Sequence, residues 1–124
     1  MLANRRVGTM IPVHDLKRAT DWYRDRLGLE PKSRYHDMGA SYVLGEGTEF
    51  FLYQTPNAGQ APHTLMSFYT DTIEEDMKRM REAGVEFIDY PELSTVDGLM
   101  DTGEVKNAWF KDSEGNILGI VEGS

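Results

Sequence analysis

Two short apolar runs that flank a polar turn close the chain and predict a β-hairpin. Residues 108–110 and 117–121 are apolar, and the segment between them, Asp112-Ser-Glu-Gly-Asn116, is rich in turn-forming residues. Gly115 supplies the positive φ that a tight turn requires. A second hairpin of the same kind is expected at 41–54, with its turn at Glu46 and Gly47.

Two other segments repeat their apolar residues at helical spacing. The first helix is predicted between Asp15, a favourable N-cap, and Gly28, a favourable residue after a helix. The second is predicted between Asp71, or Thr72, and Gly84. Asp15 and Gly28 are 13 positions apart, and so are Asp71 and Gly84, which indicates an internal repeat.

The order strand, helix and three further strands occurs twice along the chain. Strands are expected at 7–13, 30–37, 42–44 and 48–55 in the first copy, and at 63–70, 85–90 and the closing hairpin in the second. The second copy is about 12 residues longer, and the segment 91–103 is expected to be a long loop or ragged strand. Because neither copy can bury its sheet alone, the two should pack together.

The predicted fold class is therefore α+β. Two tandem βαβββ modules, at about 5–56 and 63–124, should form a cup-shaped, partly open barrel with the helices on its convex side. The whole chain, 1–124, is expected to be a single domain.

Composition narrows the classes of partner. A net charge of −8 argues against nucleic acid, whose binding depends on clustered Lys and Arg. No apolar run approaches the roughly 20 residues of a membrane span, and residues 1–6 lack the apolar stretch of a secretory signal. The chain has no cysteine, which excludes disulfides and thiolate chemistry. We therefore expect a cytoplasmic protein that binds neither nucleic acid nor a membrane.

Two stretches resemble the vicinal oxygen chelate superfamily. They are Thr9-Met-Ile-Pro-Val-His-Asp-Leu-Lys-Arg-Ala-Thr-Asp-Trp-Tyr-Arg-Asp-Arg-Leu-Gly-Leu29 and Trp109-Phe-Lys-Asp-Ser-Glu-Gly-Asn-Ile-Leu-Gly-Ile-Val-Glu122. That superfamily contains glyoxalase I, extradiol dioxygenases, fosfomycin-resistance enzymes and bleomycin-resistance proteins. The resemblance implies the tandem-module fold over nearly the whole chain. It also implies a homodimer, because related proteins commonly complete the cup with a second subunit.

The resemblance also implies where a metal would be held. In the metalloenzymes of the superfamily, up to four strand positions supply His, Gln or Glu to a divalent metal. The matching positions here are Gly8, Leu52 (within one residue), Leu65 and Gly119, and none of these side chains can bind a metal. We therefore expect no metal and no other cofactor. A replacement metal site built from His63 with Glu49, His36 or Glu104 is conceivable, although no motif spacing supports it.

Strand alternation predicts which side chains line the cup. If the four matched positions face inward, residues two positions away do so too, and cross-strand pairing adds Val43 and Phe110. Trp109 should then point the opposite way, under a helix. The predicted ligand-binding residues are mostly apolar with a few polar groups, as in a small-molecule site: Met10, Val43, Phe50, Leu52, Gln54, His63, Leu65, Ser67, Tyr69, Phe110 and Gly119. The alternative is a barrel filled by these same side chains.

Two classes of function follow. The first is a metal-independent binding protein of the bleomycin-resistance kind, which holds a mostly apolar or aromatic, antibiotic-like molecule. The second is a lyase, isomerase or dioxygenase with a displaced metal site or metal-free acid–base chemistry, for which His63 is the candidate catalytic residue. The sequence leaves open whether the chain is an enzyme, and whether 91–103 forms a lid or a fixed wall.

Overall fold

The structure is a computed structural model that describes residues 1–123. Its first half contains β1 (Thr9–Val13), α1 (Leu16–Leu27), β2 (Ser33–Tyr35), β3 (Gly39–Val43) and β4 (Glu49–Gln54). Its second half contains β5 (Thr64–Thr70), α2 (Ile73–Glu82), β6 (Leu99–Asp101), β7 (Lys106–Lys111) and β8 (Ile117–Glu122). Short 3₁₀ turns occur at Gly45–Gly47 and Pro91–Leu93. The last position of the predicted second module, 124, lies outside the described residues.

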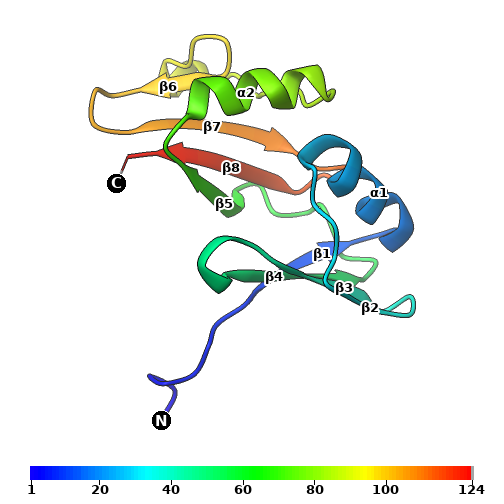
Figure 1. The fold of residues 1–124 in the computed structure, drawn as a ribbon. Coiled ribbons are helices and arrows are strands. Elements are labelled where there is room, and N and C mark those ends of the chain that lie inside the picture. The colour runs from blue at the N-terminus through cyan, green and yellow to red at the C-terminus, as the bar shows by residue number, and fades with distance from the viewer. Residues whose placement is uncertain (124) are drawn as a thin grey trace.

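Each half of the chain builds one four-stranded sheet, and the strand orders match (Figure 1). The orders are β1-β4-β3-β2 and β5-β8-β7-β6; the first strand of each half runs parallel to the last, and the other neighbours are antiparallel. This correspondence confirms the two tandem modules. Within residues 1–123 the two sheets stay separate and open, and neither closes into a barrel.

Both helices begin and end close to the predicted residues. The Asp15 side chain accepts a hydrogen bond from the Arg18 backbone N–H (3.0 Å), and Gly28 adopts the left-handed conformation (φ 70°) that ends α1. The first backbone N–H of α2, on Ile73, instead donates to the Glu122 carboxylate (2.9 Å) at the end of β8. In the described part of the chain, no helix has both the length and the apolar character to cross a membrane.

One apolar core joins the two modules. The helix-facing side of the first sheet packs with α1 and with residues of the second sheet, including Phe110 and Leu118. Trp22 of α1 stacks on Phe110 with ring centroids 6.3 Å apart, and Phe110 is fully buried. A smaller cluster lies between α2, through Ile73 and Met77, and strands β7 and β8. The shared core explains why the two modules stabilise each other.

A buried polar cluster ties the turn of the closing hairpin to the start of α1. Tyr23 donates its hydroxyl proton to the Asp112 carboxylate (2.7 Å), and the Asn116 side-chain amide donates to the Pro12 carbonyl (2.7 Å). The Glu114 side chain accepts hydrogen bonds from the residues that open α1, including both Nε and Nη2 of Arg18 (2.8 and 2.9 Å). This cluster fixes the second module against the β1–α1 connection of the first.

The expected strand at 85–90 does not form, and the short strand β6 lies instead in 91–103, the segment expected to be a long loop or ragged strand. Residues 85–90 run beside β7 but make only a single bridge, from Phe87 to Phe110, and one further backbone bond, from Ile88 N–H to the Trp109 carbonyl (2.8 Å). The start of β7 pairs instead with β6. Two segments therefore share the outer edge of β7, which local sequence patterns do not reveal.

Gly39 is the first residue of β3, three positions before the strand predicted at 42–44. A Cβ atom at this position would be 2.4 Å from the Phe51 ring and 2.5 Å from the Leu52 carbonyl oxygen, so only glycine fits between these groups. The turn comes just before Gly39, where His36 has a φ of 55° and Met38 N–H donates to the Tyr35 carbonyl (3.0 Å). As a result, β3 begins earlier than the sequence predicts.

Candidate ligand-binding cavity

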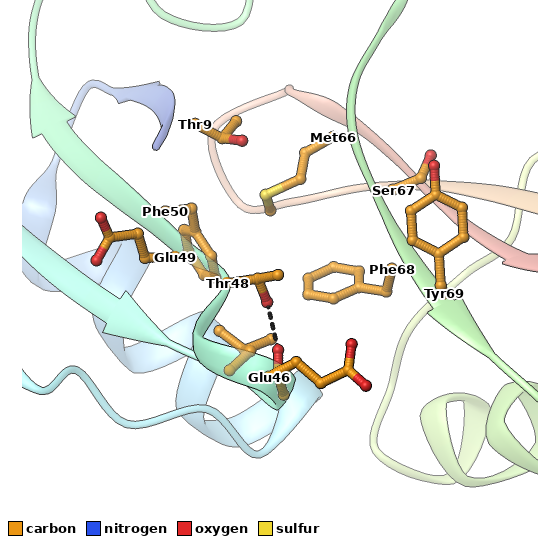
Figure 2. A pocket seen from close by; sticks show the side chains of 11 residues that line it. Thr9, Glu46, Thr48, Glu49, Phe50, Met66, Ser67, Phe68 and Tyr69 are labelled. Atoms are coloured by element: carbon orange, nitrogen blue, oxygen red, sulfur yellow. Dashed lines mark hydrogen bonds between the residues drawn. The ribbon is translucent and has the colours of Figure 1, made fainter. Parts of the chain in front are cut away.

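A cavity of about 470 Å³ lies between the two modules (Figure 2). The start of β1, the β3–β4 turn and the start of β4 provide one side, and β5 provides the other. Its volume is within the usual range for small-molecule sites. The eleven residues that line it are Thr9, Leu44, Gly45, Glu46, Thr48, Glu49, Phe50, Met66, Ser67, Phe68 and Tyr69.

The apolar part of the cavity is held in place by the core. Phe50 is 3% exposed and stacks on Tyr42, with ring centroids 4.5 Å apart and an interplanar angle of 4°. Phe68 meets Phe50 edge to face across the two modules, at a centroid distance of 6.5 Å. Met66 extends from β5 into the same space (Figure 2). These groups offer a preformed apolar surface to a flat ligand.

The β3–β4 turn shapes the exposed edge of the cavity. Thr48 donates its hydroxyl proton to the Gly45 carbonyl (2.9 Å), and Leu44 N–H donates to the Thr48 carbonyl (2.8 Å). Glu46 and Gly47 both lie in the left-handed region, with φ of 59° and 76°. Gly47 adopts this conformation freely, whereas a glutamate does so rarely. The turn thus presents the Glu46 side chain from a defined backbone position.

A second hollow lies on the opposite side of the first sheet. We call the side of this sheet that faces away from α1 the open face; register and exposure place Met10, Tyr35, Val43, Phe51 and Tyr53 on it. Met10 is 62% exposed and Tyr35 is 48% exposed. A hollow of about 540 Å³ at one end of this face is lined by Tyr35, Asp37, Met38, Phe51, Tyr53 and Gln54. The open face is therefore a largely apolar surface.

Of the predicted ligand-binding residues, the structure brings Phe50, Ser67 and Tyr69 together in the cavity. Met10 and Val43 lie on the open face instead. Leu65 packs against the core, and His63 is exposed just before β5, outside the cavity lining. The predicted set is thus divided between separate surfaces of the molecule.

The predicted phase of β4 is wrong. Alternation grouped Met10 with Phe50, Leu52 and Gln54, but Met10 pairs with Phe51, so Phe51 and Tyr53 share its face. Leu52 is fully buried on the helix side, and Gln54 accepts a hydrogen bond from Leu16 N–H (2.9 Å) at the start of α1. Both faces of β4 are apolar, so hydrophobicity alone does not set the phase.

The predicted phase of β7 is wrong in the same way. Phe110, expected in the cup, is fully buried between Trp22 and Phe87. Trp109, expected under a helix, pairs with Gly119 and meets Tyr90 edge to face at 5.3 Å. A Cβ on Gly119 would lie 2.7 Å from the Ser67 hydroxyl, so Gly119 allows close packing between its neighbours.

The described residues gather no set of side chains suited to a divalent metal. Gly8, Leu52, Leu65 and Gly119, the four positions matched to metal ligands by the resemblance, supply no donor side chain. Among residues 1–123, no three His, Asp or Glu side chains are gathered so that they could hold an ion. The alternative of a replacement site around His63 is therefore not formed in the described chain.

Sequence reasoning missed most of the cavity lining. Thr9, Met66, Phe68 and the β3–β4 turn were not among the candidates. The turn itself was predicted at Glu46 and Gly47, but a turn signal does not indicate which neighbouring strand the loop faces. Met66 and Phe68 lie on the side of β5 that alternation had assigned away from the cup.

Comparisons with known proteins agree with this architecture. The model of the Glyoxalase/Bleomycin resistance protein/Dioxygenase superfamily matches residues 6–120. A search among curated proteins found no match. Several solved structures share the fold. A glyoxalase/bleomycin resistance protein from Catenulispora acidiphila has a TM-score of 0.74 and 23% identity, covering 96% of this chain and 98% of its own.

Two further solved structures belong to proteins with contrasting functions. TnmS3, an antibiotic binding protein from a Streptomyces species, has a TM-score of 0.72 and 23% identity over 100% of both chains. A lactoylglutathione lyase from Agrobacterium tumefaciens has a TM-score of 0.73 and 17% identity, covering 99% of this chain and 96% of its own. At these identities the likeness shows the fold alone, and one fold carries both binding and catalysis.

Proposed function

Because the chain belongs to the glyoxalase/bleomycin resistance protein/dioxygenase superfamily, we propose that it is a small-molecule-binding protein that holds a mostly apolar or aromatic ligand without a metal. The observation that carries this proposal is the cavity of about 470 Å³ with Phe50, Met66 and Phe68 on its apolar side. Polar groups at the exposed edge, including Thr48 and Tyr69, would orient the ligand. The antibiotic-binding relative supports this class of function on the same fold.

Blocking the cavity should weaken binding while the fold is retained. Thr9 lines the cavity at the start of β1, so Thr9→Trp places an indole beside Phe50. We expect this variant to raise the Kd for a neutral aromatic probe, 1-naphthalenemethanol, by about tenfold or more. Isothermal titration calorimetry measures the Kd, and the probe should also raise the melting temperature of the unmodified protein.

The matched control for the added tryptophan is Gln60→Trp, at an exposed position of the connection between the modules. It should bind the probe as the unmodified protein does. Binding that survives Thr9→Trp, in a variant with an unchanged far-UV circular dichroism spectrum, would remove the cavity as the site.

The binding of the same probe also tests whether the protein needs a metal. Affinity that is unchanged after treatment with EDTA, together with substoichiometric metal in the purified protein, is the expected result. Stoichiometric metal whose removal abolishes binding would favour the enzyme class, a lyase, isomerase or dioxygenase of the superfamily.

We further propose that a second copy of the chain covers the open face. Its exposed apolar side chains, such as Met10 and Tyr53, are of the kind that interfaces bury. The double variant Met10→Glu/Tyr53→Glu should weaken dimerisation by about tenfold or more, because it introduces two desolvated charges. Sedimentation equilibrium measures this change. The double variant Leu93→Glu/Val96→Glu, at exposed apolar positions away from this face, should leave the dimer intact.

A further inference from the structure

We propose that the ligand of the cavity is an organic cation: a flat apolar body that contacts Phe50, Met66 and Phe68, with an ammonium or amidinium group at Glu46. This inference rests on the proposed function and specifies its ligand class. It follows from the distribution of charge around the cavity and from the geometry of the β3–β4 turn.

The charged residues that line the cavity are all acidic. Its lining contains two carboxylates, Glu46 and Glu49, and no Lys, Arg or His. Glu49 is already paired with Arg6, at 3.1 Å. In residues 1–123, no hydrogen bond or ion pair within 4.0 Å engages the Glu46 carboxylate. An anionic ligand would be repelled here, whereas a cation would find a free partner.

The two glutamates point in different directions. Figure 2 shows the Glu46 carboxylate extending from the turn on the side of Phe68, while the Glu49 carboxylate points away from Phe68. The Glu46 backbone lies in the left-handed region, with a φ of 59°. Such a conformation is unfavourable for a glutamate, and conformations of this kind concentrate at ligand sites.

Aromatic groups near Glu46 also favour a positively charged ligand group. Phe68 and Tyr69 line this end of the cavity, and Tyr69 is 83% exposed. An ammonium group close to their ring faces gains a cation–π attraction in addition to the carboxylate. The apolar surface of Phe50 and Met66 lies deeper and suits a hydrocarbon body. The described chain gathers no three His, Asp or Glu side chains that could hold a metal ion.

Three probes with one naphthalene body and different charges test the proposal: 1-naphthylmethylamine, 1-naphthalenemethanol and 1-naphthoate. At low ionic strength and pH 7, we expect the amine to bind about tenfold more tightly than the alcohol, and the carboxylate most weakly. Glu46→Gln should abolish the advantage of the amine and leave the Kd of the alcohol unchanged. Glu92→Gln, which makes the same charge change outside the cavity lining, should preserve that advantage.

The outcomes separate this inference from the proposed function. If amine and alcohol bind equally, or if Glu46→Gln keeps the preference for the amine, the cation assignment is wrong and the binding cavity stands. If none of the three probes binds the unmodified protein, the binding proposal fails and the cation assignment fails with it. Loss of the preference on adding salt would support the charge pairing, because screening weakens exposed ion pairs.

Discussion

Glu114→Gln should lower the free energy of unfolding by about 3 kcal/mol at pH 7. The Glu114 side chain is fully buried and accepts five hydrogen bonds that hold the closing hairpin against the start of α1. Its partners are His14 N–H, Asp15 N–H, Nε and Nη2 of Arg18, and the Ser113 hydroxyl. A neutral amide loses the charge-assisted part of these bonds and places an N–H₂ group where donors converge.

The stability lost in Glu114→Gln should be large at neutral pH and smaller in acid. Burial alone would raise the pKa of Glu114, but the hydrogen bonds from Arg18, Asp15 N–H and Ser113 and the Arg18 charge outweigh it, so the pKa falls to about 2. Because the folded pKa lies below the ordinary value of 4.5, the stabilisation is complete above about pH 5. It is lost as the pH falls toward 2.

Urea unfolding at pH 7 and pH 3 measures this dependence. The difference between the unmodified protein and Glu114→Gln should narrow from about 3 to about 1 kcal/mol. Glu86→Gln, at an exposed position, should change stability little at either pH. An equal loss at both pH values would show that the Glu114 charge does not carry the effect.

Asp112 has the opposite effect on how stability depends on pH. Burial raises its pKa above the ordinary value, despite the hydrogen bonds from Tyr23 and Asn116 that favour its ionised form. A raised folded pKa contributes stability below the ordinary value and loses it as the pH rises through the folded pKa. The acid loss attributed to Glu114 is therefore best isolated by comparing the glutamine variant with the unmodified protein.

Features that depend on a few neighbouring residues could be predicted from the sequence. The Asp15 cap, the Gly28 stop and the Gly115 turn all act within four or five positions of the chain, and all three form as expected. The repeat followed from the equal spacing of such signals, and it gave the two tandem modules; the order of the strands within each sheet comes from the structure.

Features that depend on which side of a strand meets the core could not be predicted in the same way. On β4, the run Phe50-Phe51-Leu52-Tyr53 is apolar on both faces, so its phase is set by pairing with β1. The register places Leu52 beside Ile11 in the core and leaves Tyr53 on the open face. A shift of one residue exchanges the two faces, which is why the predicted lining was divided between them.

Long-range polar contacts were equally hidden. Asp112 and Asn116 fitted a turn prediction, and nothing near Glu114 in the sequence shows that it meets His14, 100 positions away. The cavity edge is a similar case, because tertiary packing brings the β5 residues Met66 to Tyr69 opposite the β3–β4 turn. Local patterns therefore predicted the scaffold better than the site.

Phe110→Ala should have the largest effect on stability, about 3–5 kcal/mol. The Phe110 ring is fully buried, stacks on Trp22 and meets Phe87 edge to face at 5.8 Å. It lies in the core that joins the modules, so its removal leaves a cavity where α1 and the second sheet meet. Denaturant unfolding measures the loss of stability. If Phe110→Ala does not fold, Phe110→Leu takes its place; it keeps much of the side-chain volume and should lose less stability.

Trp109, the neighbouring residue, provides the control. Sequence alternation places Trp109 under a helix and Phe110 in the cup, whereas the structure buries Phe110 in the core. Trp109 is half-buried on the other face of β7, where it meets Tyr90. Trp109→Ala should cost less than half as much as Phe110→Ala, although it removes the larger side chain, since partly exposed groups contribute less apolar burial. If Trp109→Ala proved the more destabilising, the ring on the core side of β7 would be Trp109, and the phase of the closing hairpin would be the one that alternation predicts.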